Sequence, residues 1–280
     1  MKPPTTVGVY GGGRMGAGIA HAFLLAGAEV TIIESGPEAV AAARGRVESS
    51  LNRAAARGSL PETLEKLSAR LTVTTDTSAL AASGLVVEAV PEIADLKATV
   101  LGRIEKIAPD AVVATNTSSL SIDRLAAQLA RPATFLGLHF FNPVPASELV
   151  EIVVGSKTDA AIVTDAHRWV DALGKTAITV ADSPGFASSR LGVAIAVEAM
   201  RMLEEGAASA ADIDAAMTLG YKHPVGPLRT TDIVGLDVRL AIADHLAREL
   251  GARFEPPAIL REKVADGHLG RKTGRGFYTW

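Results

Sequence analysis

Two kinds of segment alternate over the first 180 residues of the chain. Short runs rich in Val and Ile recur between longer stretches in which apolar residues return with helical spacing. Strands of a parallel sheet are buried on both faces and are connected through helices, so this alternation predicts an α/β fold with a doubly wound sheet. The predicted strands cover residues 6–10, 30–33, 71–74, 85–88, 111–115, 135–139, 149–154 and 176–180, and the predicted helices cover residues 14–26, 37–57, 93–107, 121–129 and 160–173.

The pattern changes at Pro184, after which strand-like runs become scarce. The segment Asp-Ser-Pro-Gly at 182–185 is a turn signal, in which the Asp or Ser is suited to cap the following helix and the Pro to occupy its first turn. We therefore expect two domains, residues 1–183 with the sheet and residues 184–280 built only from helices. The predicted helices of the second domain cover residues 184–205, 210–219, 226–250 and 256–266.

The composition narrows the class of protein. Hydrophobic residues make up 48% of the 280 residues and charged ones 21%, as in ordinary globular domains, which excludes a disordered or fibrous chain. With 28 Lys and Arg against 31 Asp and Glu, the net charge of −3 provides no broad basic field for nucleic acid or an anionic membrane. The absence of Cys excludes disulfides and thiolate catalysis. Without a signal-peptide pattern or a run of about 18 apolar residues, we expect a soluble, cytoplasmic protein.

A glycine-rich turn follows the first predicted strand and opens the first predicted helix. It contains the pattern G-x-G-x-x-G as Gly11, Gly13 and Gly16. Gly11 permits the tight turn, Gly13 lets backbone N–H groups approach a pyrophosphate, and Gly16 lets the helix lie close to the sheet. The phosphates would meet unpaired N–H groups at the positive end of the helix dipole. The turn therefore predicts a Rossmann-type dinucleotide-binding domain; the alternative is a glycine-rich loop that binds no dinucleotide.

An acidic residue selects between the two nicotinamide dinucleotides. The second predicted strand ends at Glu34, 18 residues after Gly16. A carboxylate at this point accepts hydrogen bonds from the ribose hydroxyls and repels a 2′-phosphate, so NAD is favoured over NADP. Binding of NADP stays open as an alternative, because Arg44 and Arg46 lie further along the chain and could fold back to a phosphate.

A histidine and a carboxylate are candidates for acid–base chemistry. His139 ends a predicted strand, at the edge of the sheet where open α/β folds bind ligands. Glu151 lies in the next strand, where a carboxylate among apolar residues needs a partner, and a neighbouring strand would bring it within reach of the imidazole. Ser118 follows another strand and could bind a substrate alcohol or carbonyl. The alternative is a structural role for His139. We expect the other histidines to be structural or exposed, and no set of His, Asp and Glu shows the spacing of metal ligands.

A hydride acceptor beside a His–Glu pair predicts the oxidation of a secondary alcohol. The base removes the hydroxyl proton while hydride leaves the same carbon for the nicotinamide.

At this point the sequence resembles a known family, the L-3-hydroxyacyl-CoA dehydrogenases, which include bacterial 3-hydroxybutyryl-CoA dehydrogenases. The resemblance extends over essentially the whole chain. It is carried by eight segments in the same order: 11–20 (GGGRMGAGIA), 86–92 (VVEAVPE), 116–121 (NTSSLS), 139–145 (HFFNPVP), 182–186 (DSPGF), 224–228 (PVGPL), 234–237 (VGLD) and 271–278 (RKTGRGFY).

The resemblance implies roles for individual residues. His139 would be the catalytic base and Glu151 its partner, while Ser118 would contact the substrate hydroxyl and the cofactor. Without the resemblance, Glu92 and Lys97 are interpreted as surface residues at the start of a helix, and Lys272 as a solvated charge of the tail. The resemblance implies an NAD site that consists of Gly11, Gly13, Met15, Gly16, Glu34, Glu92, Lys97, Asn116, Ser118, Asn142 and Lys272.

The resemblance also implies an acyl-CoA substrate and a homodimer formed through the helical domain. The family places a Ser and a Lys that touch CoA on the helix after the second strand. Ser50 and Arg57 occupy these places, and Arg keeps the positive charge while offering a planar fork to phosphate. The alternative for Arg57 is a solvated helix face.

One position departs from the family pattern. Ser189 stands where the family has an active-site Asn that donates to the thioester carbonyl. Losing one well-placed donor reduces a rate by about 10²–10³-fold. We therefore expect either slower turnover of ordinary 3-hydroxyacyl-CoA or a differently shaped substrate, such as a carrier-protein-bound 3-hydroxyacyl group or a free 3-hydroxy acid. A relative that binds NAD without turnover is the remaining alternative.

Overall fold

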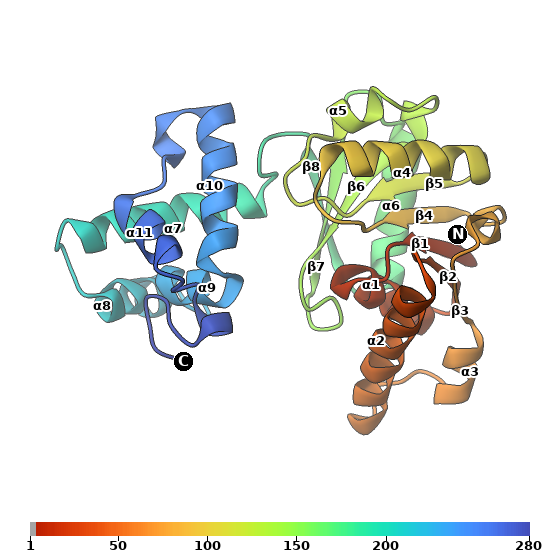
Figure 1. The fold of residues 1–280 in the computed structure, drawn as a ribbon, viewed down its shortest axis with the longest axis horizontal. Coiled ribbons are helices and arrows are strands. Elements are labelled where there is room, and N and C mark those ends of the chain that lie inside the picture. Colours follow the sequence, from red (N-terminus) through yellow and green to blue (C-terminus); the bar gives the residue numbers. More distant parts are fainter. Residues whose placement is uncertain (1–3) are drawn as a thin grey trace. The chain divides into compact units, whose positions relative to one another are not determined.

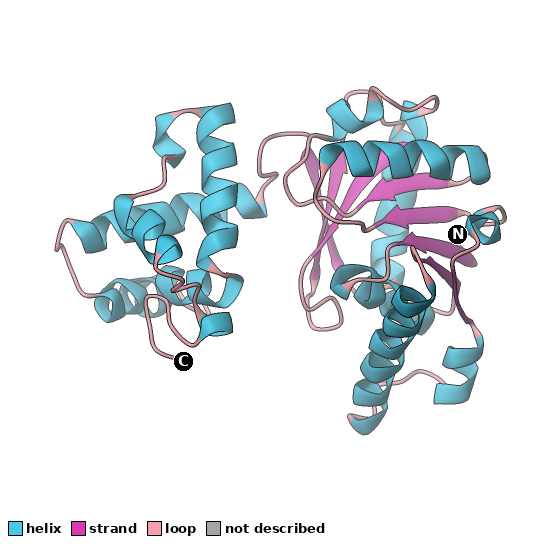
Figure 2. Ribbon diagram, viewed as in Figure 1, coloured by secondary structure: helices cyan, strands magenta, loops and turns pink. Residues whose placement is uncertain are grey.

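The chain folds into two compact units, and the boundary along the chain lies between Ser183 and Pro184. The computed structural model describes residues 4–280. The first unit contains a sheet with helices on both faces, and the second is built from helices (Figures 1 and 2). Both features confirm the predicted fold class.

All eight predicted strands form, and they lie in a single sheet. Their order is β3-β2-β1-β4-β5-β6-β7-β8. Strands β2 and β3 are added on one side of β1, and β4 to β8 are added on its other side. Neighbouring strands are parallel except β6 and β7, which are antiparallel. The strands are β1 (Thr6–Tyr10), β2 (Glu29–Ile33), β3 (Leu71–Thr74), β4 (Leu85–Glu88), β5 (Val112–Thr115), β6 (Phe135–Phe140), β7 (Leu149–Val154) and β8 (Thr176–Ala181).

The helices of the first unit follow the predicted pattern with one addition. The short helix α3 was not predicted, because six residues are too few to show a period; the hydroxyl of Thr63 caps it by accepting from the N–H of Lys66. Apolar side chains of α1, α2 and α6 pack on the sheet in one large core. The helices are α1 (Arg14–Leu25), α2 (Pro37–Ala56), α3 (Leu64–Ala69), α4 (Ala94–Ile107), α5 (Ile122–Ala126) and α6 (Ala160–Ala172), with short 3₁₀ turns at Thr77–Leu80 and Pro132–Thr134.

The predicted start of the first helix after the domain boundary was wrong. Helix α7 (Ser188–Glu204) begins four residues later than Pro184 and has no side-chain cap. Gly185 and Phe186 have φ of +73° and +50°, which interrupts the helical path. Asp182, predicted as a possible cap, instead accepts hydrogen bonds from the hydroxyl of Ser121 (2.7 Å) and the N–H of Asp123 (2.9 Å), at the start of α5.

The predicted helix over residues 226–250 is two helices. Gly235 separates them with a φ of +109°, a conformation that a helix interior does not allow. The helices of this unit are α7, α8 (Ala210–Ala215), α9 (Pro227–Val234), α10 (Leu236–Leu250) and α11 (Ala258–Ala265), with a π-helical turn at Ala216–Gly220 and 3₁₀ turns at Ala252–Phe254 and Arg271–Thr273.

Two buried carboxylates bind the C-terminal tail to this unit. Asp232 accepts from the N–H groups of Phe277 (2.8 Å) and Tyr278 (2.9 Å) and from the indole N–H of Trp280 (2.8 Å). Asp214 accepts from the hydroxyl of Tyr278 at 2.7 Å. The tail is therefore an integral part of the helical fold.

Candidate active site

The glycine turn between β1 and α1 leaves one position open to a ligand. A Cβ on Gly11, whose φ is +99°, would lie 3.0 Å from the carbonyl of Ala89, and a Cβ on Gly16 would lie 1.8 Å from the oxygen of Gly11. A Cβ on Gly13 would meet nothing within 4 Å. Gly13 is the N-cap of helix α1 and offers no side chain to cap it. The unoccupied side of Gly13 and the uncapped N–H groups fit the pyrophosphate of a dinucleotide.

The carboxylate of Glu34 lies against this turn. Its Oε1 accepts from the N–H of Gly12 at 2.7 Å, and the guanidinium of Arg46 donates to the carbonyl of Gly12 at 3.1 Å. Arg44 instead pairs with Glu48 along α2. An acid and a single arginine therefore flank the position at which a Rossmann fold binds the adenosine ribose.

This arrangement predicts the outcome of replacing Glu34. The Glu34→Ala variant should use NADH less well and NADPH better, so that the ratio of kcat/KM for the two cofactors shifts by about 10²-fold, because the repulsion of a 2′-phosphate is removed while Arg46 stays. Adding Arg46→Ala should abolish the gain with NADPH, and Arg44→Ala should leave it unchanged. An unaltered cofactor ratio in Glu34→Ala would refute this role of Glu34.

His139 and Glu151 face each other across the antiparallel pair β6–β7. The two residues are direct register partners, and Nδ1 of the imidazole lies 2.7 Å from Oε2 of the carboxylate. Glu151 has no exposed surface and His139 is 6% exposed. The ring of Phe141 lies 4.4 Å from the imidazole, centroid to centroid. A buried carboxylate at Nδ1 holds the proton there and leaves Nε2 as the basic nitrogen.

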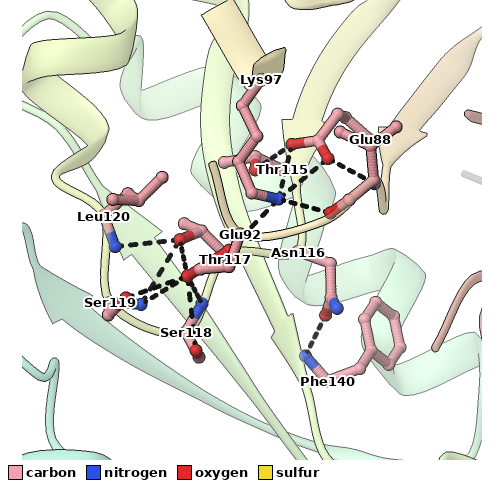
Figure 3. Close-up of polar contacts among 11 residues, drawn as sticks. Glu88, Glu92, Lys97, Thr115, Asn116, Thr117, Ser118, Ser119, Leu120 and Phe140 are labelled. Carbon is pink, nitrogen blue, oxygen red and sulfur yellow. Dashed lines mark hydrogen bonds and ion pairs between the residues drawn. The ribbon is translucent and has the colours of Figure 1, made fainter. Parts of the chain in front are cut away.

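Ser118 lies in a loop that converges on one carboxylate. Oε1 of Glu92 accepts from the hydroxyl of Thr117 (2.6 Å), the N–H of Ser118 (2.9 Å) and the N–H of Ser119 (3.1 Å), and both serine hydroxyls reach the same oxygen (Figure 3). Burial alone would raise the pKa of Glu92, but the charge of Lys97 and these hydrogen bonds outweigh it and hold that pKa below its ordinary value. Glu92 is therefore an ionised acceptor that organises the loop.

Lys97 is not a surface residue, so for this residue the interpretation reached without the resemblance was wrong, whereas Glu92 is exposed as that interpretation has it. Its ammonium has no exposed surface and lies 2.9 and 3.1 Å from the two oxygens of Glu88 and 3.3 Å from Oε2 of Glu92. It also donates to the carbonyl of Val90 at 3.2 Å, and the hydroxyl of Thr115 donates to Glu88 at 2.6 Å. Glu88 was not singled out from the sequence; a carboxylate that ends a buried strand was the available signal.

The two predicted asparagines differ in their surroundings. Oδ1 of Asn116, directly after β5, accepts from the N–H of Phe140 at 2.9 Å and so joins β5 to the residue after His139 (Figure 3). Asn142 is exposed in the turn after β6. Met15 is half-buried in the first turn of α1 and packs against the core.

Three cations act on the buried His21, and they include the predicted Arg57. We call Arg53, Arg57 and Lys175 the basic cluster. His21 on α1 is buried, and its pKa is lowered to about 4, first by burial and then by the positive charges of Arg53, Arg57 and Lys175. Ser50 is buried on α2, whereas Arg57 is exposed directly after the last residue of α2. The sequence predicted neither Arg53 nor Lys175 for this region; the four-residue spacing of Arg53 and Arg57 on one helix was the only local signal.

Two predicted residues lie in the second unit. Ser189 belongs to the first turn of α7. Lys272 is half-exposed, and its ammonium lies 2.6 Å from both carboxylate oxygens of Asp237.

Two family models match consecutive parts of the chain. The model for "3-hydroxyacyl-CoA dehydrogenase, NAD binding domain" matches residues 6–183, and the model for "3-hydroxyacyl-CoA dehydrogenase, C-terminal domain" matches residues 185–280. Together they cover nearly the whole chain.

Known proteins are similar over the same length. The 3-hydroxybutyryl-CoA dehydrogenase of Mycobacterium tuberculosis is 41% identical over 279 residues, which cover 98% of each chain. A probable 3-hydroxybutyryl-CoA dehydrogenase of Deinococcus radiodurans is 39% identical, over 98% of this chain and 99% of the relative. The crystal structure of (S)-3-hydroxybutyryl-CoA dehydrogenase from Ralstonia eutropha superposes with a TM-score of 0.94 at 40% identity and covers 99% of both chains.

Proposed function

Since this chain belongs to the 3-hydroxyacyl-CoA dehydrogenase family of NAD-dependent oxidoreductases, we propose that His139 and Glu151 are the pair with which it oxidises a 3-hydroxyacyl-CoA to the 3-oxoacyl-CoA. The observation that carries this proposal is the 2.7 Å contact between Nδ1 and the buried carboxylate. Nε2 of His139 takes the proton of the 3-hydroxyl group. Bound at the glycine turn, NAD would supply the acceptor for the hydride on C3 of the substrate. In the reverse direction the imidazolium returns the proton to the 3-oxo oxygen.

Glu151 supports the base in two ways. Its carboxylate keeps the proton on Nδ1 and orients the ring, and its charge stabilises the imidazolium formed during oxidation. Complete burial strengthens both effects, because no water screens the charge.

The remaining site residues carry supporting roles in this proposal. The hydroxyl of Ser118, held by Glu92, contacts the substrate oxygen, and Ser189 takes the part of the family Asn at the thioester carbonyl. The open side of Gly13, the uncapped start of α1 and the carboxylate of Glu34 support NAD binding at the turn. The proposed NAD site comprises Gly11, Gly13, Met15, Gly16, Glu34, Glu92, Lys97, Asn116, Ser118, Asn142 and Lys272.

The substrate we propose is a short 3-hydroxyacyl-CoA such as (S)-3-hydroxybutyryl-CoA, the substrate named for the similar enzymes. The cations of Arg53, Arg57 and Lys175, which all act on His21, support an anionic carrier with phosphate groups. A carrier-protein-bound ester and a free 3-hydroxy acid are the competing substrates, favoured by Ser189.

A direct comparison of substrates tests this proposal. We expect kcat/KM for the CoA ester of 3-hydroxybutyrate to exceed that for the carrier-bound ester and the free acid by at least about 10²-fold, since CoA brings more phosphate groups to the basic cluster than either of them. In the Arg53→Ala and Arg57→Ala variants, KM should rise for the CoA ester but not for the free acid. Equal kcat/KM for the free acid would contradict a CoA substrate.

We also propose that the chain forms a homodimer through the helical unit. Large apolar side chains of that unit are exposed, among them Leu191 (63%), Leu219 (72%) and Tyr221 (76%), which supports burial against a second copy. Light scattering should give a mass near twice 29.0 kDa, and a monomer at micromolar concentration would contradict the proposal.

None of the helices in residues 4–280 is long and apolar enough to cross a membrane. The cytoplasmic location stays a prediction.

A further inference from the structure

A buried ion pair connects the end of β4 to the first turns of α4. The Nζ of Lys97 lies 2.9 and 3.1 Å from the carboxylate oxygens of Glu88, and neither side chain is reached by water (Figure 3). Two charges lose their hydration when they are buried, so such a pair seldom stabilises a fold more than apolar residues of the same volume would. Stability therefore does not account for its presence, and a second role must be sought in its contacts.

The pair is saturated with hydrogen bonds. Glu88 also accepts from the N–H of Val90 (2.6 Å) and the hydroxyl of Thr115 (2.6 Å), and Lys97 donates to the carbonyl of Val90 (3.2 Å). These contacts tie together the ends of β4 and β5 and the start of α4. The ammonium of Lys97 is consequently held in one place.

From this place Lys97 reaches a second carboxylate. Its Nζ lies 3.3 Å from Oε2 of Glu92, whose other oxygen receives the hydrogen bonds of Thr117, Ser118 and Ser119. A continuous chain of polar contacts thus runs from Glu88 through Lys97 and Glu92 to the loop that carries Ser118. Glu92 divides its two oxygens between the cation and the loop.

We propose that Glu88 is a positioning residue for the dehydrogenase reaction: it anchors Lys97 so that Glu92 faces the loop at 117–119 and fixes the hydroxyl of Ser118. Without Glu88, Glu92 is the anionic partner that the ammonium retains within residues 4–280, and that carboxylate turns toward it and away from the loop. The inference rests on the role proposed above for Ser118, and the experiment separates the two.

A double-mutant cycle tests the connection between the buried pair and Ser118. The pair is replaced by apolar residues of similar size, Glu88→Leu with Lys97→Met, so that no unpaired charge remains. In the parent, Ser118→Ala should lower kcat for acetoacetyl-CoA reduction by about 10²-fold. The replaced pair by itself should lower kcat by about 10²-fold as well. In that background Ser118→Ala should lower kcat further by less than about threefold, since the hydroxyl is no longer held in place.

The pH dependence of kcat is a readout that loss of stability alone would not move. The positive charge of Lys97 keeps the pKa of Glu92 lowered, so in the parent Glu92 remains ionised and holds the loop well into the acid range. Removing that charge raises the pKa of Glu92. Activity of the replaced variant should therefore decline at a higher pH than that of the parent as the solution is acidified.

Glu105 provides a matched control on the same helix. It is a buried carboxylate near the end of α4 and holds a different loop, accepting from the N–H groups of Ala130 and Arg131 at 2.9 Å each. Glu105→Gln should lower the melting temperature without moving the acid limb of kcat, and it should combine additively with Ser118→Ala. Glu88→Gln, which keeps the shape of the side chain, serves as a second variant if the replaced pair folds poorly; it should reduce kcat and likewise diminish the effect of Ser118→Ala.

The outcomes separate the two hypotheses. A costly Ser118→Ala whose effect is the same in both backgrounds would overturn the positioning role of Glu88 and leave that of Ser118 intact. A Ser118→Ala variant with parental kcat would refute the role of Ser118, and the inference would fall with it. A rise in KM for NADH at unchanged kcat in Glu88→Gln, which keeps Lys97 of the proposed NAD site, would indicate that Glu88 serves cofactor binding, which also contradicts the inference.

Discussion

Replacing His139 by Ala is expected to lower kcat for acetoacetyl-CoA reduction with NADH by about 10³–10⁴-fold, at unchanged KM for NADH. In the proposed function the imidazole exchanges a proton with the 3-oxygen, and the carboxylate of its partner Glu151 lies 2.7 Å away on the far nitrogen. The loss should appear in both directions of the reaction, because the same nitrogen accepts the proton in oxidation and returns it in reduction.

The controls for this prediction separate chemistry from folding. His139→Gln keeps a polar side chain in the same buried position and should be as inactive as His139→Ala. His167→Ala removes a histidine of α6 that contacts the hydroxyl of Thr179 at 2.7 Å, in the same unit, and should retain parental activity. Parental turnover in His139→Ala would mean that another group is the base, and the proposed function of the pair would have to be abandoned.

Replacing Glu151 by Gln is expected to lower kcat by about 10²–10⁴-fold, the second-largest effect. Gln has the same shape, so the strand pairing of β6 and β7 should survive. The amide carries no charge to stabilise the imidazolium, and its NH₂ group can donate to Nδ1, which would place the proton on Nε2, where the base must be free of it.

Thermal unfolding and a nearby glutamate complete that experiment. Glu148→Gln alters an exposed carboxylate just before β7 and should leave kcat unchanged. NADH should stabilise Glu151→Gln against heat as it does the parent, since the cofactor site is intact. If Glu151→Gln keeps more than about a third of parental kcat, the carboxylate is not needed for the proton transfer, and its burial beside His139 would be structural.

Local patterns predicted most of the fold. The eight strands appear where short apolar runs rich in Val and Ile occur, and the helices of the first unit appear where the apolar period is helical. The errors fall where backbone conformation overrides that period. Gly235 divides an apolar helical stretch in two, and Gly185 with Phe186 delays the start of α7. A positive φ leaves no trace in the spacing of hydrophobic residues.

The candidate site was predictable only in part. His139 ends a predicted strand and Ser118 follows another, so their place at one edge of the sheet was expected. Glu151 was expected within a neighbouring strand, in reach of the imidazole, and the 2.7 Å contact agrees with that expectation. The involvement of Glu88 and the grouping of Lys175 with His21 and the α2 arginines were not expected.

The amino-acid sequence by itself determined the succession of strands and helices along the chain, the glycine turn and the acidic residue directly after β2. Each of these depends on residues close together in the chain. Only the tertiary structure decided that Lys97 lies buried between two carboxylates, that Glu92 collects the loop of Ser118, and that β7 runs antiparallel to β6 with Glu151 opposite His139. The physical reason is that a charged side chain has the same local pattern whether it is solvated or buried. Its burial is decided by partners that other segments bring to it, and those partners offset the loss of hydration.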